Sequence, residues 1–275
     1  MGYLGQTTRE GFNYMTPTFV DVAGGNLSAQ DMQLGADATT GSANIQVLDE
    51  EGLAPKTFNW YPKTSIVNFY SDYDHKNLIV VPEGKNGMWL LQKSERIAPK
   101  PPVTYYEVLD KDFEPSDAVQ VWAKEKDMIV TTAGAVPDED MLLSTIAGFN
   151  YFGNPFPVTI SAQDFQLDEE ATTGSANIQV LDEEGLAPKT FNWYPKTSIV
   201  NFYSDYDHKN LIVVPEGKKG MWLIQKSERI APKPPVTYYE VLDKTLVAGE
   251  AIQLWAKEAE MEVTVTCPYD LKATK

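Results

Sequence analysis

The feature that most constrains this chain is a nearly verbatim internal duplication. Residues 38–111 return as residues 171–244 at an offset of 133, and only Asn86 against Lys219 and Leu91 against Ile224 differ. Weaker similarity continues upstream, where Gly-Phe-Asn-Tyr recurs at 11–14 and 148–151. A unit of about 130 residues has the size of a domain and is too long for a solenoid repeat. The sequence therefore predicts two tandem domains, residues 1–137 and 138–275, whose duplication is natural or engineered.

Each copy contains many short segments rich in β-branched and aromatic residues and bounded by Gly, Pro, Asn or Asp. Such segments favour strands, and their close spacing is typical of antiparallel sandwiches and barrels. The prediction is an all-β chain of two tandem antiparallel β-sandwich domains, jelly-roll or Ig-like. Helix signals are sparse, and a Ser followed three residues later by Asp predicts one capped turn per copy, at Ser28 and Ser161. The expected strands of the first copy are residues 42–48, 56–61, 64–70, 77–81, 88–93, 103–109, 118–123 and 127–132.

Composition excludes several classes of function. The chain has 39 acidic and 23 basic residues, for a net charge of −16, and most of this charge lies outside the repeated block. A strongly acidic chain lacks the basic face that sequence-independent nucleic-acid binding requires. No stretch approaches the roughly 20 apolar residues of a membrane span, so membrane insertion is not expected. The single Cys excludes an internal disulfide framework.

No pattern of residues indicates catalysis, and we expect no enzyme activity and no catalytic residue. His75 and His208 are the same residue in the two copies, each inside a polar stretch that predicts a loop. Cys267 has no counterpart in the first copy, and we expect it to be structural. Nucleotide-binding and nucleophile-elbow motifs are missing from the sequence.

Two further sets of residues could bind a ligand. The Trp residues are expected in the core, whereas exposed Tyr rings could form a stacking platform for sugars, with the two copies giving avidity. The platform candidates are Tyr61, Tyr70, Tyr73, Tyr194, Tyr203 and Tyr206. Dense acidic clusters predict a solvated rim or, alternatively, a Ca²⁺ site, since Ca²⁺ prefers several oxygen ligands. No other cofactor is expected. The calcium candidates are Asp138, Glu139, Asp140, Asp168, Glu169 and Glu170.

The start of the second copy carries a short motif. Residues 148–157 read GFNYFGNPFP, and residues 11–19 hold a decayed version. This stretch resembles the GFN-x-x-x-NPFP opening motif of uncharacterised secreted bacterial β-sandwich repeat proteins. The resemblance implies a β-sandwich fold and an extracellular or cell-surface location, and it implies no known activity. The chain departs from that pattern because residues 2–11 lack the basic and apolar regions of a signal peptide.

These observations together predict a structural subunit of an extracellular assembly, such as a filament, tube, fibre or surface layer. Its partner would be a second copy of the chain, joined head to tail or by strand addition. The expected joining strands are marked by Tyr3, Leu4, Thr7, Val263 and Val265. The alternative is a tandem carbohydrate-binding or adhesion module, with a glycan as the partner.

Overall fold

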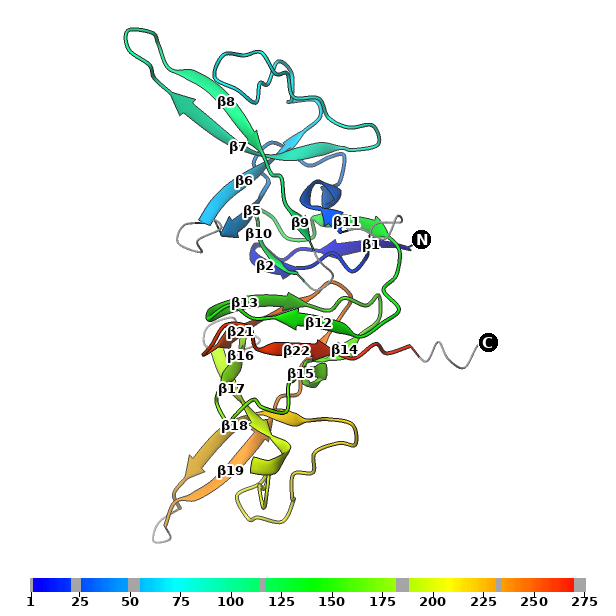
Figure 1. Ribbon diagram of the computed structural model, residues 1–275, viewed down its shortest axis with the longest axis vertical. Coiled ribbons are helices and arrows are strands. Elements are labelled where there is room, and N and C mark those ends of the chain that lie inside the picture. Colours follow the sequence, from blue (N-terminus) through cyan, green and yellow to red (C-terminus); the bar gives the residue numbers. More distant parts are fainter. Residues whose placement is uncertain are drawn as a thin grey trace. The chain divides into compact units, whose positions relative to one another are not determined.

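The computed structural model describes residues 2–20, 26–48, 55–113, 117–181, 188–230 and 234–269. These residues form an all-β chain with antiparallel pairing throughout, as Figure 1 shows. The chain divides into two compact units. Unit 1 is Met1–Pro137 with Ala248–Glu250, and unit 2 is Asp138–Val247 with Ala251–Lys275.

Unit 1 contains two main sheets and a short two-stranded one. The six-stranded sheet has the order β2 (Gly11–Met15), β10 (Val119–Ala123), β5 (Ala43–Leu48), β6 (Pro55–Pro62), β7 (Gly87–Glu95) and β8 (Val103–Val108). The three-stranded sheet has the order β1 (Gly2–Thr7), β11 (Ile129–Gly134) and β4 (Gln33–Leu34). The short sheet pairs β3 (Leu27–Ser28) with β9 (Asp112–Phe113), and the 3-10 turn η1 (Ala29–Asp31) follows β3.

Unit 2 repeats this plan strand for strand. Its six-stranded sheet runs β13 (Gly148–Gly153), β21 (Ala251–Ala256), β16 (Ala176–Leu181), β17 (Pro188–Pro195), β18 (Gly220–Glu228) and β19 (Val236–Val241). Its three-stranded sheet runs β12 (Met141–Ser144), β22 (Glu262–Val265) and β15 (Phe165–Leu167). The remaining elements are β14 (Ile160–Ser161) paired with β20 (Thr245–Leu246), and the 3-10 turns η2 (Ala162–Asp164) and η3 (Lys196–Ser198).

Side-chain alternation along the strands builds one core between the two main sheets of unit 1. The strand β10 buries Val119, Val121 and Ala123 and turns its other side chains away, as the period of two requires. The core cluster joins residues of both sheets, with Leu34 and Val130 from the three-stranded sheet. At its centre, Trp60 and Trp89 are fully buried and meet edge to face at 5.1 Å between ring centroids.

A second apolar cluster covers the opposite face of β6 and β7. There the segment of residues 63–86, which we call the β6–β7 loop, packs Ile66 and Ile79 against Met88 and Leu90. The strand β7 is therefore buried on both faces over Gly87–Leu90, which explains its continuous apolar sequence. Unit 2 has the equivalent cluster and an equivalent loop, residues 196–219.

The strand predictions are confirmed for six of the eight segments of the first copy and wrong for two. Residues 64–70 and 77–81 belong to the β6–β7 loop, which contains only the isolated bridge Tyr70↔Leu78. Asn68 and His75 adopt positive φ angles of 58° and 54°, which interrupt an extended strand. In these segments Ile66 and Ile79 pack onto the sheet, whereas Val67, Leu78 and Val80 stay exposed. The capped turns are confirmed, because Ser28 and Ser161 each form a capping box with an Asp.

Candidate functional site

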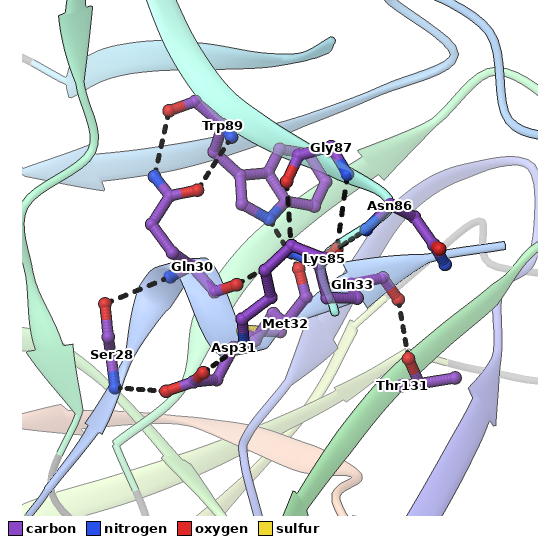
Figure 2. A network of polar contacts seen from close by, with 10 residues as sticks. All are labelled: Ser28, Gln30, Asp31, Met32, Gln33, Lys85, Asn86, Gly87, Trp89 and Thr131. Carbon is purple, nitrogen blue, oxygen red and sulfur yellow. Dashed lines mark hydrogen bonds and ion pairs between the residues drawn. The ribbon is translucent and has the colours of Figure 1, made fainter. Parts of the chain in front are cut away.

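A network of side-chain amides fixes the region where β4, η1 and β7 meet (Figure 2). The Gln30 side chain accepts a bond from Trp89 N at 3.0 Å and donates to Trp89 O at 3.1 Å and Leu109 O at 3.0 Å. Its amide continues the β7–β8 ladder beyond the last backbone pair, Leu90↔Val108. The Trp89 indole N–H donates to Met32 O at 2.6 Å. This network attaches η1 firmly to the six-stranded sheet.

A second amide, that of Gln33, holds the end of the β6–β7 loop. Its Oε1 accepts bonds from Asn86 N at 2.7 Å and Gly87 N at 3.3 Å, and its Nε2 donates to Gln30 O at 2.7 Å. Unit 2 repeats the arrangement with Gln163 and Gln166. The sequence analysis did not predict a structural role for either amide, although Gln30 and Gln163 lie in the recurring Ser-Ala-Gln-Asp at 28–31 and 161–164.

A groove of about 520 Å³ opens beside this network in unit 1. Its walls come from β1, β4, β11, the turn η1 and loop residues 83–86. The side chains of Asp31 and Lys85 form an ion pair there, as Figure 2 shows, and Asn86 Nδ2 donates to Leu34 O at 2.9 Å. The ring of Tyr3 also lines the groove and is 73% exposed. The groove therefore combines a fixed polar floor with one open aromatic ring.

The predicted aromatic platform does not form around Tyr61. Tyr61 and Tyr194 are buried, and Tyr61 contacts Phe69 and Tyr106 edge to face. Burial, followed by the nearby Tyr106, raises the pKa of Tyr61 above its ordinary value. Neither Tyr61 nor Tyr194 presents a ring face to a ligand, so this part of the platform prediction is wrong.

The other platform candidates lie in the β6–β7 loop and in its copy in unit 2. Tyr70 stacks on His75 at 4.6 Å between ring centroids, and Tyr203 stacks on His208 in the same way. The hydroxyls of Tyr73 and Tyr206 are buried, with no hydrogen-bond partner among the described residues. Tyr70 and Tyr203 are therefore engaged with a residue of their own loop. A role of these four residues in sugar binding stays a prediction.

The loop is held in one conformation by Asp72. Its carboxylate accepts backbone bonds from Lys76 N and Asn77 N, the latter at 2.7 Å. These backbone hydrogen bonds lower the pKa of Asp72 below its ordinary value. The predicted loop at His75 is confirmed, and His75 Nε2 lies 3.0 Å from Thr104 O on β8.

The same loop covers part of the outer edge of β8. Tyr106 N donates to Tyr70 O at 2.8 Å, in addition to the contact between His75 and Thr104. Since β8 ends the six-stranded sheet, its outward backbone groups would otherwise be free to pair with another chain. The loop therefore limits strand addition at this edge.

The loop nevertheless exposes apolar side chains, and it does so identically in both units. Val67, Leu78 and Val80 are 65%, 53% and 72% exposed. Their counterparts in unit 2 have almost the same exposure. We call these residues the exposed loop set: Val67, Leu78, Val80, Val200, Leu211 and Val213.

The two predicted joining strands differ in their positions, because one lies at the edge of its sheet and the other at the centre. The strand β1, with Tyr3, Leu4 and Thr7, lies at the edge of its sheet and pairs with β11 over its whole length. The strand β22 lies at the centre of its sheet between β12 and β15, and Val263 and Val265 are fully buried. The prediction that β22 could be donated to another molecule is wrong, because both of its edges are already paired.

The acidic clusters do not converge on a calcium site in the described part of the chain. Among the described residues, no three or more His, Cys, Asp or Glu side chains form a group that could hold a metal. The described residues include all six candidates, Asp138, Glu139, Asp140, Asp168, Glu169 and Glu170. Asp140 and Asp168 instead accept backbone bonds, from Cys267 N at 2.7 Å and from Ala171 N at 2.8 Å. The calcium prediction is therefore not supported by this geometry.

Comparison with known proteins gives no match. No protein-family model, no curated protein and no solved structure is significantly similar to the chain. Within the described residues, no helix has the length and apolar character needed to cross a membrane.

Proposed function

We propose that this chain is a structural building block with two tandem β-sandwich domains, which assembles with copies of itself outside the cell or on its surface. The shared core between the six-stranded and three-stranded sheets supports the sandwich architecture. The resemblance of residues 148–157 to secreted repeat proteins is the reason for the extracellular location.

The observation that carries the assembly proposal is the exposed loop set. Apolar side chains that remain exposed on a well-ordered loop favour contact with another protein surface. The loop is ordered by the Asp72 turn, the buried Ile66 and Ile79, and the bond from Ile79 N to Phe69 O at 2.7 Å. Because the same loop occurs in both units, one chain offers two equivalent contacts.

Two contacts per chain are the minimum for an open polymer. When the same contact is repeated in a head-to-tail arrangement that does not close on itself, a filament or layer grows. The covered edge of β8 limits strand addition at that position. We therefore propose that loop side chains, rather than β8, form the joint.

Substitution of the loop set tests this proposal in the full chain. A variant with Val67, Val80, Val200 and Val213 changed to Asp should remain folded and lose self-association in light scattering. The variant altered in unit 1 alone should stop at small oligomers, because one joint per chain remains. The matched control changes Ile97 and Ile230 to Asp, since both are 51% exposed and lie outside the loop. Equal association by all variants would contradict the proposal.

A further inference from the structure

The groove of unit 1 has the character of a ligand site, and the assembly proposal does not use it. We propose that it binds an uncharged saccharide, with Tyr3 stacking on a sugar ring and the polar floor bonding to hydroxyl groups. All the groove residues belong to one unit, so the site is complete within unit 1. This inference is independent of the proposed assembly.

The ring of Tyr3 supplies the apolar contact. It projects from the edge strand β1, opposite Ala133 of β11, and is 73% exposed. A sugar ring has one face of C–H groups that packs well on an aromatic ring, and burial of that face is favourable.

The floor supplies hydrogen bonds in a fixed geometry. The Gln33 amide holds the backbone of Asn86 and Gly87, so the Asn86 side chain starts from a fixed position. Asn86 Nδ2 donates to Leu34 O, while the structure shows no partner for its Oδ1 among the described residues. Lys85 keeps N–H donors beyond the one that meets Asp31. The floor thus offers hydrogen-bond acceptors beside donors. A sugar hydroxyl group can use both, because it donates and accepts hydrogen bonds.

The charge of the groove favours an uncharged ligand. Its lining contributes two carboxylates, Asp31 and Glu83, and one ammonium group, Lys85. Asp31 and Lys85 neutralise each other, and Glu83 leaves a net negative charge. A phosphate or an acidic saccharide would be repelled by this charge.

Unit 2 differs from unit 1 at residues that line the groove. Lys219 replaces Asn86, which is one of only two changes within the repeated block. The strand registers place Asp140 where unit 1 has Tyr3, because Leu142 pairs with Thr264 as Gly5 pairs with Thr131. Unit 2 therefore lacks the stacking ring and carries two charged side chains, Asp140 and Lys219, where unit 1 has uncharged ones, and we expect one site per chain.

The test is calorimetric titration of the full chain with cellohexaose, maltohexaose, chitohexaose and the anionic hexagalacturonate. We expect at least one of the neutral saccharides to bind with one site per chain. Tyr3→Ala and Asn86→Lys should each weaken binding about tenfold, a change of about 1.4 kcal/mol, while Tyr3→Phe keeps the ring and the affinity. The matched control is Leu142→Ala, an exposed residue on the corresponding strand of unit 2.

Any of four results would overturn the proposal. The first is that no neutral saccharide produces binding heat at millimolar concentration and that none competes for the site. The second is binding of hexagalacturonate alone. The third is a stoichiometry of two sites per chain. The fourth is an affinity of Tyr3→Ala equal to that of the unaltered chain. Either result would place the ligand outside the groove. The variants should keep the melting temperature of the unaltered chain, so loss of binding reports the site rather than the fold.

Discussion

Replacement of Gln30 by Ala should destabilise unit 1 far more than an ordinary polar-to-Ala change. The Gln30 amide makes three hydrogen bonds to the backbone of Trp89 and Leu109. Trp89 O keeps a second partner, because Leu109 N donates to it at 3.0 Å. In the variant, the backbone groups left without a hydrogen-bond partner are therefore Trp89 N and Leu109 O. Each unsatisfied buried polar group costs about 1–3 kcal/mol, so two of them should cost at least about 2 kcal/mol.

Urea denaturation followed by Trp fluorescence measures this loss in the full chain. The variant should move the transition of unit 1 to lower urea and leave that of unit 2 in place, and Gln163→Ala should do the reverse. The control is Gln92→Ala, because Gln92 is exposed on the same strand as Trp89, and its loss should stay within about 0.5 kcal/mol. If Gln30→Ala costs no more than this control, Gln30 does not complete the ladder and the reasoning fails.

Two further perturbations test the packing and the loop. Gly87→Ala would bring a Cβ within 2.4 Å of Tyr61 O, so strands β6 and β7 must shift; overpacking costs about 1–3 kcal/mol, and a thermal melt showing no loss would contradict this. The pKa of Asp72 is lower in the folded chain than its ordinary value of 3.8. Ionised Asp72 therefore stabilises the fold at a pH above 3.8, and this contribution is lost as the pH falls through the pKa of the folded state. The double variant of Asp72 and Asp205 to Asn should melt below the unaltered chain at pH 6, and the gap should narrow as the pH falls below 3.8; a gap that does not depend on pH would refute this.

The sequence predicted the parts of the fold that depend on local pattern. The β-branched and aromatic composition of residues 118–123 identified β10, and the spacing of Ser28 and Asp31 identified the capped turn. Both features depend on neighbouring residues, so a single sequence is sufficient to find them. The expected core position of Trp122 is wrong, because alternation along β10 buries Val119 and Val121 and leaves Trp122 half-buried on the other face.

The sequence failed where a residue's role depends on distant partners. Residues 64–70 have the composition of a strand, yet they pack as a loop because Asn68 turns the chain and Ile66 is buried on β7. Val263 and Val265 looked suited to an edge strand, but the strand order places them at the centre of a sheet. Strand order is set by non-local pairing and cannot be read from local pattern.

The candidate sites show the same limit. Tyr61 was expected on a platform because its neighbours are aromatic, whereas alternation places it on the face of β6 that the loop covers. Tyr3 was expected in a joining strand, and its position beside a groove depends on residues 83–86 and on β11. A groove formed by four separate segments has no signature in any one of them.

The most direct test of the central claim is negative-stain electron microscopy of the purified chain over a range of concentrations, together with light scattering. The account predicts ordered filaments or layers whose growth increases with concentration, because each chain carries two copies of the exposed loop set. A particle that remains at the monomer mass of 30.7 kDa at every concentration would contradict it.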